Sequence, residues 1–277
     1  MHTNENIYNT FIPRWFGRLG NNVQQISNGI YYCQKNEMRF TSPDHPHINA
    51  IDLNFGSNTF DKDLLETSHN WFYFYKGPDA DFDADIADLN NKRKSICEEF
   101  ILPNLKVNKD FPPLDDDMCV AHIRSGDVYS YMSHPFYIQN PLSYYVELLD
   151  VFNGRVCFIS EDDNSPITLA LRNMGLNVNI LSVEDSYSIM LRARNIATSG
   201  VGTYAISAAF CSKNIKKLYC TNLFLDDALN PEMLKEQLEV YSMDIDNKYI
   251  KVGEWKYTSE NVKTLLEYNT STSFRRL

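Results

Sequence analysis

The second half of the chain alternates short apolar runs with segments of helical periodicity. The runs MCVAHI, RVCFIS, NVNIL, NIAT and IKKLYC are rich in β-branched residues, and each predicts a strand. Helix start signals stand between them at Asn140-Pro141, Ser165-Pro166 and the capping box Ser182–Asp185, and Gly175 marks a helix end. This alternation predicts a parallel sheet with helices on both faces, a Rossmann-like unit from about Asp117 to Asn230 with IKKLYC as its last strand.

The first half of the chain is less regular but begins in a similar way. A strand candidate in YNTFIPRWF is followed by the loop GRLGNN and by a helix on which Val23, Ile26 and Ile30 share a face. EMRF, INAIDLNF and WFYFYK are further strand candidates. Two α/β units are therefore expected, residues 1–116 and 117–277, joined at the proline-rich acidic segment FPPLDDD. The tail from about residue 251 is polar and helix-prone. One arrangement that the sequence allows is that this tail packs back on the first unit.

Composition and charge narrow the range of partners. A chain of 277 residues, 43% hydrophobic and 22% charged, has the make-up of a globular protein large enough for two cores. A formal net charge of −10 without a strongly basic run argues against nucleic acid as a partner. No apolar run approaches the roughly 18 residues of a membrane helix, and the N-terminus lacks a secretory pattern. We therefore expect a soluble protein without membrane insertion.

The cysteines and the acidic runs do not favour a metal site. The six cysteines are scattered without a C-x-x-C pair and lie mostly in apolar segments, as free core thiols do. In DADFDAD, Asp81, Asp83 and Asp85 have the D-x-D form of metal-dependent glycosyltransferases, but they follow Lys76-Gly77-Pro78 rather than a buried strand. The spacing of a calcium loop is also missing. We interpret the segment as a solvated acidic loop and expect no metal.

Polar groups stand directly behind several predicted strands. In an open parallel sheet, ligands bind beyond the carboxyl ends of the strands, so these groups are the candidates for a site. They are His122, Arg124 and Asp127; Glu161, Asp162 and Asp163; Thr198, Ser199, Gly200, Gly202 and Thr203; and, in the first unit, Gly17, Arg18, Gly20 and Asn21. Parallel strands bring the three sets of the second unit to one edge of its sheet.

The segment Ser199–Thr203 has the form of an anion-binding turn. It joins a strand to a helix N-terminus, where backbone N–H groups and the helix dipole favour negative charge, although an ordinary tight turn has the same composition. Arg124 adds a rigid fork of donors suited to a diphosphate. We expect the side chain of Arg124 to face this turn.

Four segments, in the same order, resemble the α-1,2-fucosyltransferase family. GRLGNNVQQISNGI resembles its G-G-L-G-N-Q-x-x-Q loop and helix, HIRSGD its H-x-R-R-G-D motif, FISEDD its F-S-D-D segment, and RARNIATSGVGTYAISAAF its late N-I-I-A-N-S-T-F-S-W-W segment. The matches span roughly Gly17 to Phe210, and H-x-R-x-G-D is the most specific. The wider superfamily includes α-1,6- and protein O-fucosyltransferases, and the resemblance implies an α/β fold of GT-B type, two facing Rossmann-like domains with a cleft between them.

The resemblance also implies an activity and a set of roles. The activity is that of an inverting, metal-independent glycosyltransferase that moves fucose from GDP-fucose to a glycan hydroxyl, with the nucleotide sugar as co-substrate and no cofactor. It assigns Arg124 to the donor pyrophosphate with His122 beside it, Ser199–Thr203 to phosphate or base, and Gly17–Asn22 to the cleft. The second arginine of the motif is Ser125 here. Such departures leave a UDP-linked pentose or hexose as an alternative donor, as in a xylosyltransferase.

The chemistry of the residues agrees with that reaction class. A departing diphosphate gains negative charge, which Arg124 and the helix end would meet. Asp127 is the first candidate for a base on the acceptor hydroxyl, or it caps the turn or orients Arg124. Glu161, Asp162 and Asp163 are weaker candidates for the base. Tyr129 and Tyr131, in VYSYMSHPFY, offer the acceptor sugar a stacking face or belong to a packed surface loop.

Other function classes fit the sequence less well. A nicotinamide-dependent oxidoreductase would need a third glycine, which GRLGNN lacks. A non-catalytic carbohydrate-binding protein would use the same aromatic residues but would not need an arginine at a phosphate pocket. The expected partners are thus a GDP- or UDP-linked sugar and an oligosaccharide acceptor. The expected setting is cytoplasmic, for a bacterial or viral enzyme or a trimmed form of a longer protein.

Overall fold

The computed structural model describes residues 9–12, 14–56, 66–68, 86–109, 112–270 and 272–277, and the chain divides into two compact units between Lys106 and Val107. This division lies before the 116/117 boundary predicted from FPPLDDD. The reason is that the linker is bound to the second unit: Leu114 N donates to Arg192 O at 2.9 Å. Asp116 forms ion pairs in the same unit, with Arg194 at 2.6 Å and Lys216 at 2.9 Å.

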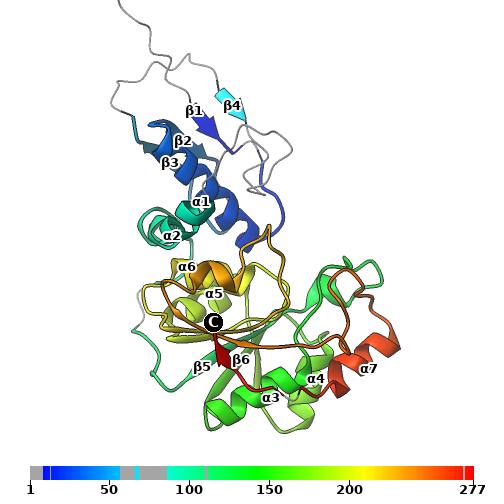
Figure 1. Cartoon of the computed structure of the whole chain (residues 1–277). Coiled ribbons are helices and arrows are strands. Elements are labelled where there is room, and N and C mark those ends of the chain that lie inside the picture. Colours follow the sequence, from blue (N-terminus) through cyan, green and yellow to red (C-terminus); the bar gives the residue numbers. More distant parts are fainter. Residues whose placement is uncertain (1–8, 13, 57–65, 69–85, 110–111, 271) are drawn as a thin grey trace, which may run out of the picture. The chain divides into compact units, whose positions relative to one another are not determined.

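The first unit is a four-stranded sheet accompanied by two helices (Figure 1). Its strand order is β3-β2-β1-β4, and only the β2–β3 pair is antiparallel among these strands. The elements are β1 (Asn9–Phe11), α1 (Leu19–Lys35), β2 (Arg39–Ser42), β3 (Ile51–Asn54), β4 (Glu66–Ser68) and α2 (Ile86–Ile96), which continues into a π-helical turn (Cys97–Ile101) and a 3₁₀ turn (Leu102–Asn104).

The sequence predictions for this unit agree with the structure where it is described. The apolar face of α1 is buried through Val23, Ile26 and Ile30, as predicted. EMRF and INAIDLNF contain β2 and β3. The strand candidate WFYFYK and the acidic run DADFDAD lie outside the described residues.

The second unit contains a seven-stranded sheet of order β11-β10-β9-β8-β5-β6-β7, parallel except for β11. Its strands are β5 (Cys119–Ile123), β6 (Val156–Ser160), β7 (Val178–Ile180), β8 (Asn195–Ala197), β9 (Lys217–Thr221), β10 (Glu239–Met243) and β11 (Arg275–Arg276). The five strands predicted from sequence are present. The prediction that IKKLYC is the last strand is wrong, because β10 and β11 extend the sheet beyond it.

Helices cover both faces of this sheet (Figure 1). On one face lie α5 (Val183–Arg192) and α6 (Tyr204–Cys211), and on the other α3 (Leu142–Val151), α4 (Pro166–Asn173) and α7 (Ser259–Glu267). Ser182 caps α5 as predicted, its hydroxyl accepting from Asp185 N at 3.0 Å. Asn140, predicted to cap α3, instead ties two strand ends together: its amide donates to Thr198 O at 2.9 Å and accepts from Thr221 Oγ1 at 2.7 Å.

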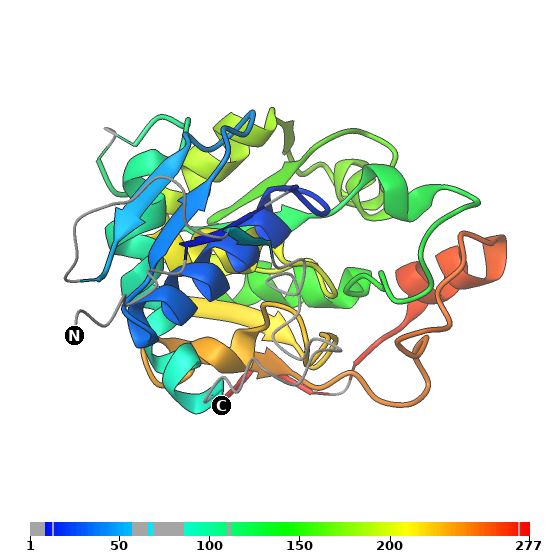
Figure 2. The ribbon, with the colours of Figure 1, turned by 90° about the horizontal axis from the view of Figure 1, so that it is seen from above.

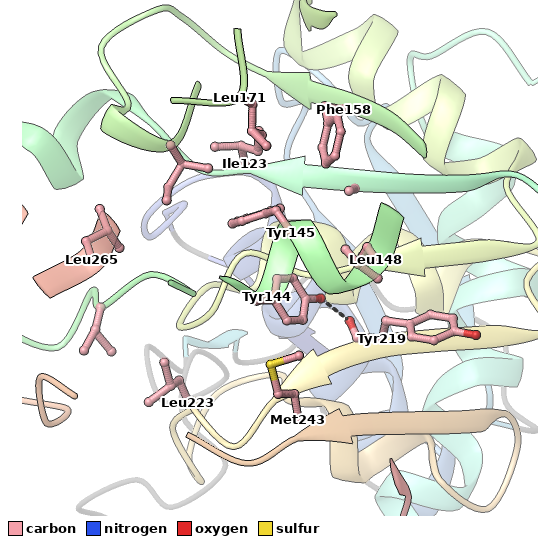
Figure 3. Packing of buried hydrophobic residues seen from close by; sticks show 14 of the residues in the cluster. Ile123, Tyr144, Tyr145, Leu148, Phe158, Leu171, Tyr219, Leu223, Met243 and Leu265 are labelled. Carbon is pink, nitrogen blue, oxygen red and sulfur yellow. Dashed lines mark hydrogen bonds between the residues drawn. The ribbon is translucent and has the colours of Figure 1, made fainter. Parts of the chain in front are cut away.

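The core of the second unit lies between the sheet and α3, α4 and α7 (Figure 3). Every residue of β5 is buried, which explains why this central strand has a continuous apolar run with one histidine. Tyr144 is fully buried and donates its hydroxyl to Tyr219 O at 2.9 Å, so its polar end is satisfied inside the core (Figure 3).

The C-terminal tail packs on the second unit, and its packing on the first unit stays a prediction. Trp255 is fully buried and donates its indole N–H to Val128 O at 2.9 Å. α7 then packs against α3 and α4, with Leu265 buried in the core. Figure 2 shows the chain leaving α7 and returning to the sheet edge as β11. None of the helices in the described ranges has the length and apolarity of a membrane span.

The order of the strands places a topological switch point beside β5. From β5 the chain builds outward through β6 and β7 on one side, and then returns to add β8, β9 and β10 on the other. The loops that follow β5 and β8 therefore leave the sheet at neighbouring strand ends on opposite faces. Crevices of this kind are where open α/β sheets bind ligands.

Candidate functional site

The loops after β5 and β8 meet at this switch point. Arg124, directly after β5, donates from Nη1 to Val201 O at 3.3 Å. A Cβ atom added to Gly202 would lie 3.4 Å from the same Nη1 and 3.9 Å from Ser199 Oγ, so this side of the turn faces the guanidinium. The prediction that Arg124 faces the glycine turn is confirmed.

The guanidinium of Arg124 is positioned by several contacts, and not all of its N–H groups are engaged in them. Nη2 donates to both carboxylate oxygens of Asp127, at 3.3 and 3.4 Å, and Cζ lies 4.1 Å from the ring centroid of Tyr137. Among the described residues, it makes three hydrogen bonds, one from Nη1 and two from Nη2. A guanidinium has five N–H donors, so at least two remain for a ligand. The side chain is 15% exposed, which keeps it in place yet within reach of solvent.

In the glycine turn Ser199–Thr203, close packing against residues 138–140 requires glycine at position 200. Gly200 has φ +90°, and a Cβ there would lie 2.8 Å from Ile138 O and 2.9 Å from Asn140 N. The turn is also hydrogen-bonded to residues 138–140: Val201 N donates to Ile138 O at 2.9 Å, and Asn140 N donates to Ser199 O at 3.3 Å. Only glycine combines the left-handed φ with so close an approach.

Helix α6 begins immediately after the turn, with Thr203 as its N-cap residue. The N–H groups of a first helical turn have no partner within the helix, and the helix dipole adds partial positive charge there. Arg124 stands beside the same turn. The two loops together therefore form an electropositive corner suited to a phosphate or diphosphate.

His122 forms the inner wall of this corner. It lies on β5, is 7% exposed, and its Nδ1 is 3.1 Å from Ser199 Oγ. Its ring packs on that of Tyr204 at 5.1 Å, and Tyr204 is fixed by donating its hydroxyl to Val183 O at 2.7 Å. Burial, with a smaller contribution from the positive charge of Arg124, lowers the pKa of His122 to about 3. His122 is therefore a neutral hydrogen-bonding group at ordinary pH.

Acidification is expected to destabilise the second unit through His122. Because the pKa of His122 in the fold, about 3, lies below the ordinary 6.5, only the unfolded chain binds this proton between those values. The contribution is fully present above pH 6.5 and decreases as the pH falls through this window, by up to about 1.4 kcal/mol per pH unit. Urea unfolding at pH 7, 6 and 5 measures this slope.

The matched variants for that measurement are His122→Gln and His134→Gln, since His134 is exposed on a loop. His122→Gln should flatten the dependence of the free energy of unfolding on pH between 5 and 7, and His134→Gln should leave it as in the wild type. An unchanged slope in His122→Gln contradicts the assignment.

Ser125, at the place of the family's second arginine, is buried and donates its hydroxyl to Asp162. The same carboxylate accepts from Asn164 N at 2.8 Å, so Asp162 holds two turns together. Asp163 forms an ion pair with Arg172 at 2.5 Å on the surface. Neither contact involves Arg124, and a role of Asp162 or Asp163 as the base stays a prediction.

Glu161 is half-buried and lies close enough to Tyr204 for its charge to act on the tyrosine hydroxyl. Burial first, and then the negative charges of Glu184 and Glu161, raise the pKa of the Tyr204 hydroxyl. No group of three or more His, Cys, Asp or Glu side chains is arranged as metal ligands in the part of the chain that the structure describes.

The two tyrosines predicted to face the acceptor sugar differ in their exposure to solvent. Tyr129 is 7% exposed, and its ring packs edge to face on Trp255 at 5.9 Å and on Tyr257 at 5.7 Å. Both neighbours belong to the C-terminal segment that covers it, so Tyr129 fits the alternative of a packed loop rather than that of a stacking face. Tyr131 is 91% exposed and stays a prediction for the acceptor.

The predicted loop of the first unit is a helix start. Gly17 has φ +66°, and Arg18, exposed, is the N-cap residue of α1, its carbonyl accepting from Asn21 N at 2.9 Å. Gly20 is buried in the first turn of the helix. Asn22 donates its amide to Phe16 O at 2.9 Å and so fixes the loop. Contact of Gly17, Arg18, Gly20 and Asn21 with a donor stays a prediction.

Sequence reasoning missed the segment Tyr137–Asn140, which supports both loops of the site. Tyr137 belongs to the aromatic stretch VYSYMSHPFY, but nothing in that stretch shows that the chain returns to Arg124 after a loop. Two features of Asn140 reveal this role, its complete burial and the hydrogen bond from its backbone N–H to the glycine turn, and both are visible only in the structure.

No protein-family model and no curated protein sequence matches the chain. Two solved structures are similar to it. A crystal structure of POFUT1 in complex with GDP is 13% identical with a TM-score of 0.43, and one of POFUT1 in complex with GDP-fucose is 14% identical with a TM-score of 0.40. Each alignment covers 79% of this chain and 99% of that chain.

Proposed function

We propose that the chain is a glycosyltransferase of GT-B type that moves a sugar from a nucleoside diphosphate donor to a glycan hydroxyl. The donor we propose is GDP-fucose, and the transfer is inverting and needs no metal. The proposal is supported by the four ordered motifs that resemble fucosyltransferases and by the meeting of two of them, HIRSGD and TSGVGT, at one switch point.

The observation that carries the proposal is the position of Arg124. Breaking a bond between a sugar and a diphosphate leaves negative charge on the departing oxygen, and that charge must be stabilised in the transition state. Arg124 presents N–H donors beside the N-terminus of α6, and its geometry is set in advance by Val201 and Asp127. His122, neutral, adds a hydrogen-bonding group without competing charge.

The acceptor hydroxyl needs a proton acceptor, for which we propose Asp127. It lies on a 3₁₀ turn (Gly126–Tyr129), its side chain is 45% exposed, and it contacts the guanidinium at 3.3 Å. In this place a base would lie near the group that we propose binds the diphosphate of the donor. Both of its hydrogen bonds to Arg124 are long, 3.3 and 3.4 Å, and its side chain is partly exposed, so an acceptor hydroxyl can approach the carboxylate.

Replacing Asp127 by asparagine is expected to lower kcat about a hundredfold with little change in the KM for the donor. Asparagine keeps an oxygen for Arg124 but does not take up a proton, and general-base catalysis contributes roughly 10²–10⁴-fold. Steady-state transfer assays at several donor concentrations separate the two parameters. A variant within threefold of the wild-type kcat would leave Asp127 only the role of orienting Arg124.

The experiment that tests the function has two parts. Thermal unfolding with GDP-, UDP- and dTDP-sugars identifies the nucleotide, since a ligand at 100 times its Kd stabilises the folded state by about 2.7 kcal/mol. Donor hydrolysis and transfer are then followed with EDTA present. We expect the largest stabilisation from GDP-fucose and turnover unaffected by the chelator.

Each rival gives a different result in these assays. Stabilisation by a UDP-sugar alone assigns a pentosyl- or hexosyltransferase in place of the fucosyltransferase. Stabilisation by free oligosaccharides without donor turnover indicates a non-catalytic carbohydrate-binding protein. Loss of turnover in EDTA contradicts the metal-independent mechanism.

A further inference from the structure

The segment Tyr137–Asn140 touches both halves of the proposed diphosphate site. Its first residue lies against the guanidinium, with Arg124 Cζ 4.1 Å from the centroid of the Tyr137 ring. The next residue holds the glycine turn, because Ile138 O accepts from Val201 N at 2.9 Å. One short piece of chain therefore sets the distance between the arginine and the anion-binding turn.

The hydrogen bonds that orient Arg124 are long. Its hydrogen bonds to Val201 O and to the two oxygens of Asp127 measure 3.3, 3.3 and 3.4 Å, longer than the usual N–H···O distance of about 2.9–3.0 Å. Asp127 is also 45% exposed, so water competes for its carboxylate. The guanidinium also lies over the Tyr137 ring, with Cζ 4.1 Å from the centroid, and a cation over an aromatic face is attracted to it.

We propose that Tyr137 is a positioning residue that presents Arg124 to the diphosphate of the donor. The ring contacts the guanidinium at Cζ, and a contact of this kind uses none of its N–H donors. Val201 O accepts from Nη1, and the same nitrogen lies beside Gly202, where an added Cβ atom would be 3.4 Å away. This inference rests on the proposed function, because it assumes that Arg124 binds a diphosphate.

The test is a double-mutant cycle on nucleotide affinity. GDP and UDP are titrated by calorimetry into the full chain as wild type, Tyr137→Leu, Tyr137→Phe, Arg124→Ala and the double variant Tyr137→Leu/Arg124→Ala. We expect Tyr137→Leu to weaken binding of the preferred nucleotide about tenfold, which is 1.4 kcal/mol. Tyr137→Phe keeps the ring and should stay within threefold of the wild type.

The double variant separates positioning from general damage. If Tyr137 acts through Arg124, Tyr137→Leu has no further effect once Arg124 is alanine. Phe136→Leu, which removes a 44% exposed aromatic residue from the same loop, is the matched control and should bind GDP and UDP as the wild type does. Should Tyr137→Leu lower the melting temperature, Tyr137→Met, which keeps more bulk without an aromatic face, takes its place in the cycle.

The possible results distinguish this inference from the proposed function. Wild-type nucleotide affinity in Arg124→Ala overturns the diphosphate site itself. Weak binding in Arg124→Ala together with wild-type binding in Tyr137→Leu overturns the positioning role alone. Equal losses in Tyr137→Phe and Tyr137→Leu, or an additive double variant, also overturn it, because the effect then does not come from the ring acting on the guanidinium.

Discussion

Replacing Arg124 by alanine is expected to lower turnover about 100- to 1000-fold while the protein stays folded. The loss of one preorganised electrostatic donor to a charge that develops in the transition state has roughly this effect on kcat. The fold is expected to survive because Arg124 lies at a strand end and its partners are a backbone carbonyl and a half-exposed carboxylate. Transfer kinetics and thermal unfolding of the same preparations measure the two effects.

Two further variants make the arginine result specific. Arg124→Lys keeps the charge but loses the planar fork, so it should recover only part of the activity. Arg275→Ala removes an exposed arginine of the same unit, paired with Asp244 at 2.9 Å on the edge strand β11, and should retain full turnover. Near wild-type turnover in Arg124→Ala would remove the central residue from the proposed mechanism.

Much of the second unit could be predicted because its signals are local. The β5 run is continuous because both faces of a central strand are buried, and the Ser182 capping box specifies a helix start from four adjacent residues. The edge of the sheet could not be predicted in this way. β10 is five residues long with alternating partial burial, and β11 consists of two exposed arginines, so neither has a strong local pattern.

In the candidate site, too, some features follow from the sequence and others depend on tertiary packing. That Arg124 meets the glycine turn follows from a general rule, since parallel strands deliver their carboxyl-end loops to one edge. The contacts of Tyr137 and Ser125 follow from no such rule. They depend on where the chain returns after a loop and on which buried hydroxyl reaches Asp162, which are results of tertiary packing. For the same reason the sequence could not show that Trp255 covers Tyr129.

Replacing Gly200 by alanine is expected to abolish turnover and to lower the stability of the protein. The residue has φ +90°, which is strained for any residue with a side chain, and the new methyl group would lie 2.8 Å from Ile138 O. Strain of this kind costs about 1–3 kcal/mol, and overpacking adds a similar amount, about 1–3 kcal/mol. Because the atoms in the way are backbone, the turn has to separate from residues 138–140, and the guanidinium of Arg124 then loses Val201 as its partner.

Gly175→Ala is the matched control, since Gly175 has a similar φ of +83° at the end of α4 but nothing within 4 Å of an added Cβ. The control carries the conformational strain without the collision, so the difference between the two free energies of unfolding measures the close approach of the turn. We expect Gly175→Ala to keep full turnover and Gly200→Ala to lose it even at temperatures where both are folded. Equal stabilities and equal activities in the two variants would mean that the turn is not held against residues 138–140, and the electropositive corner would lose its structural basis.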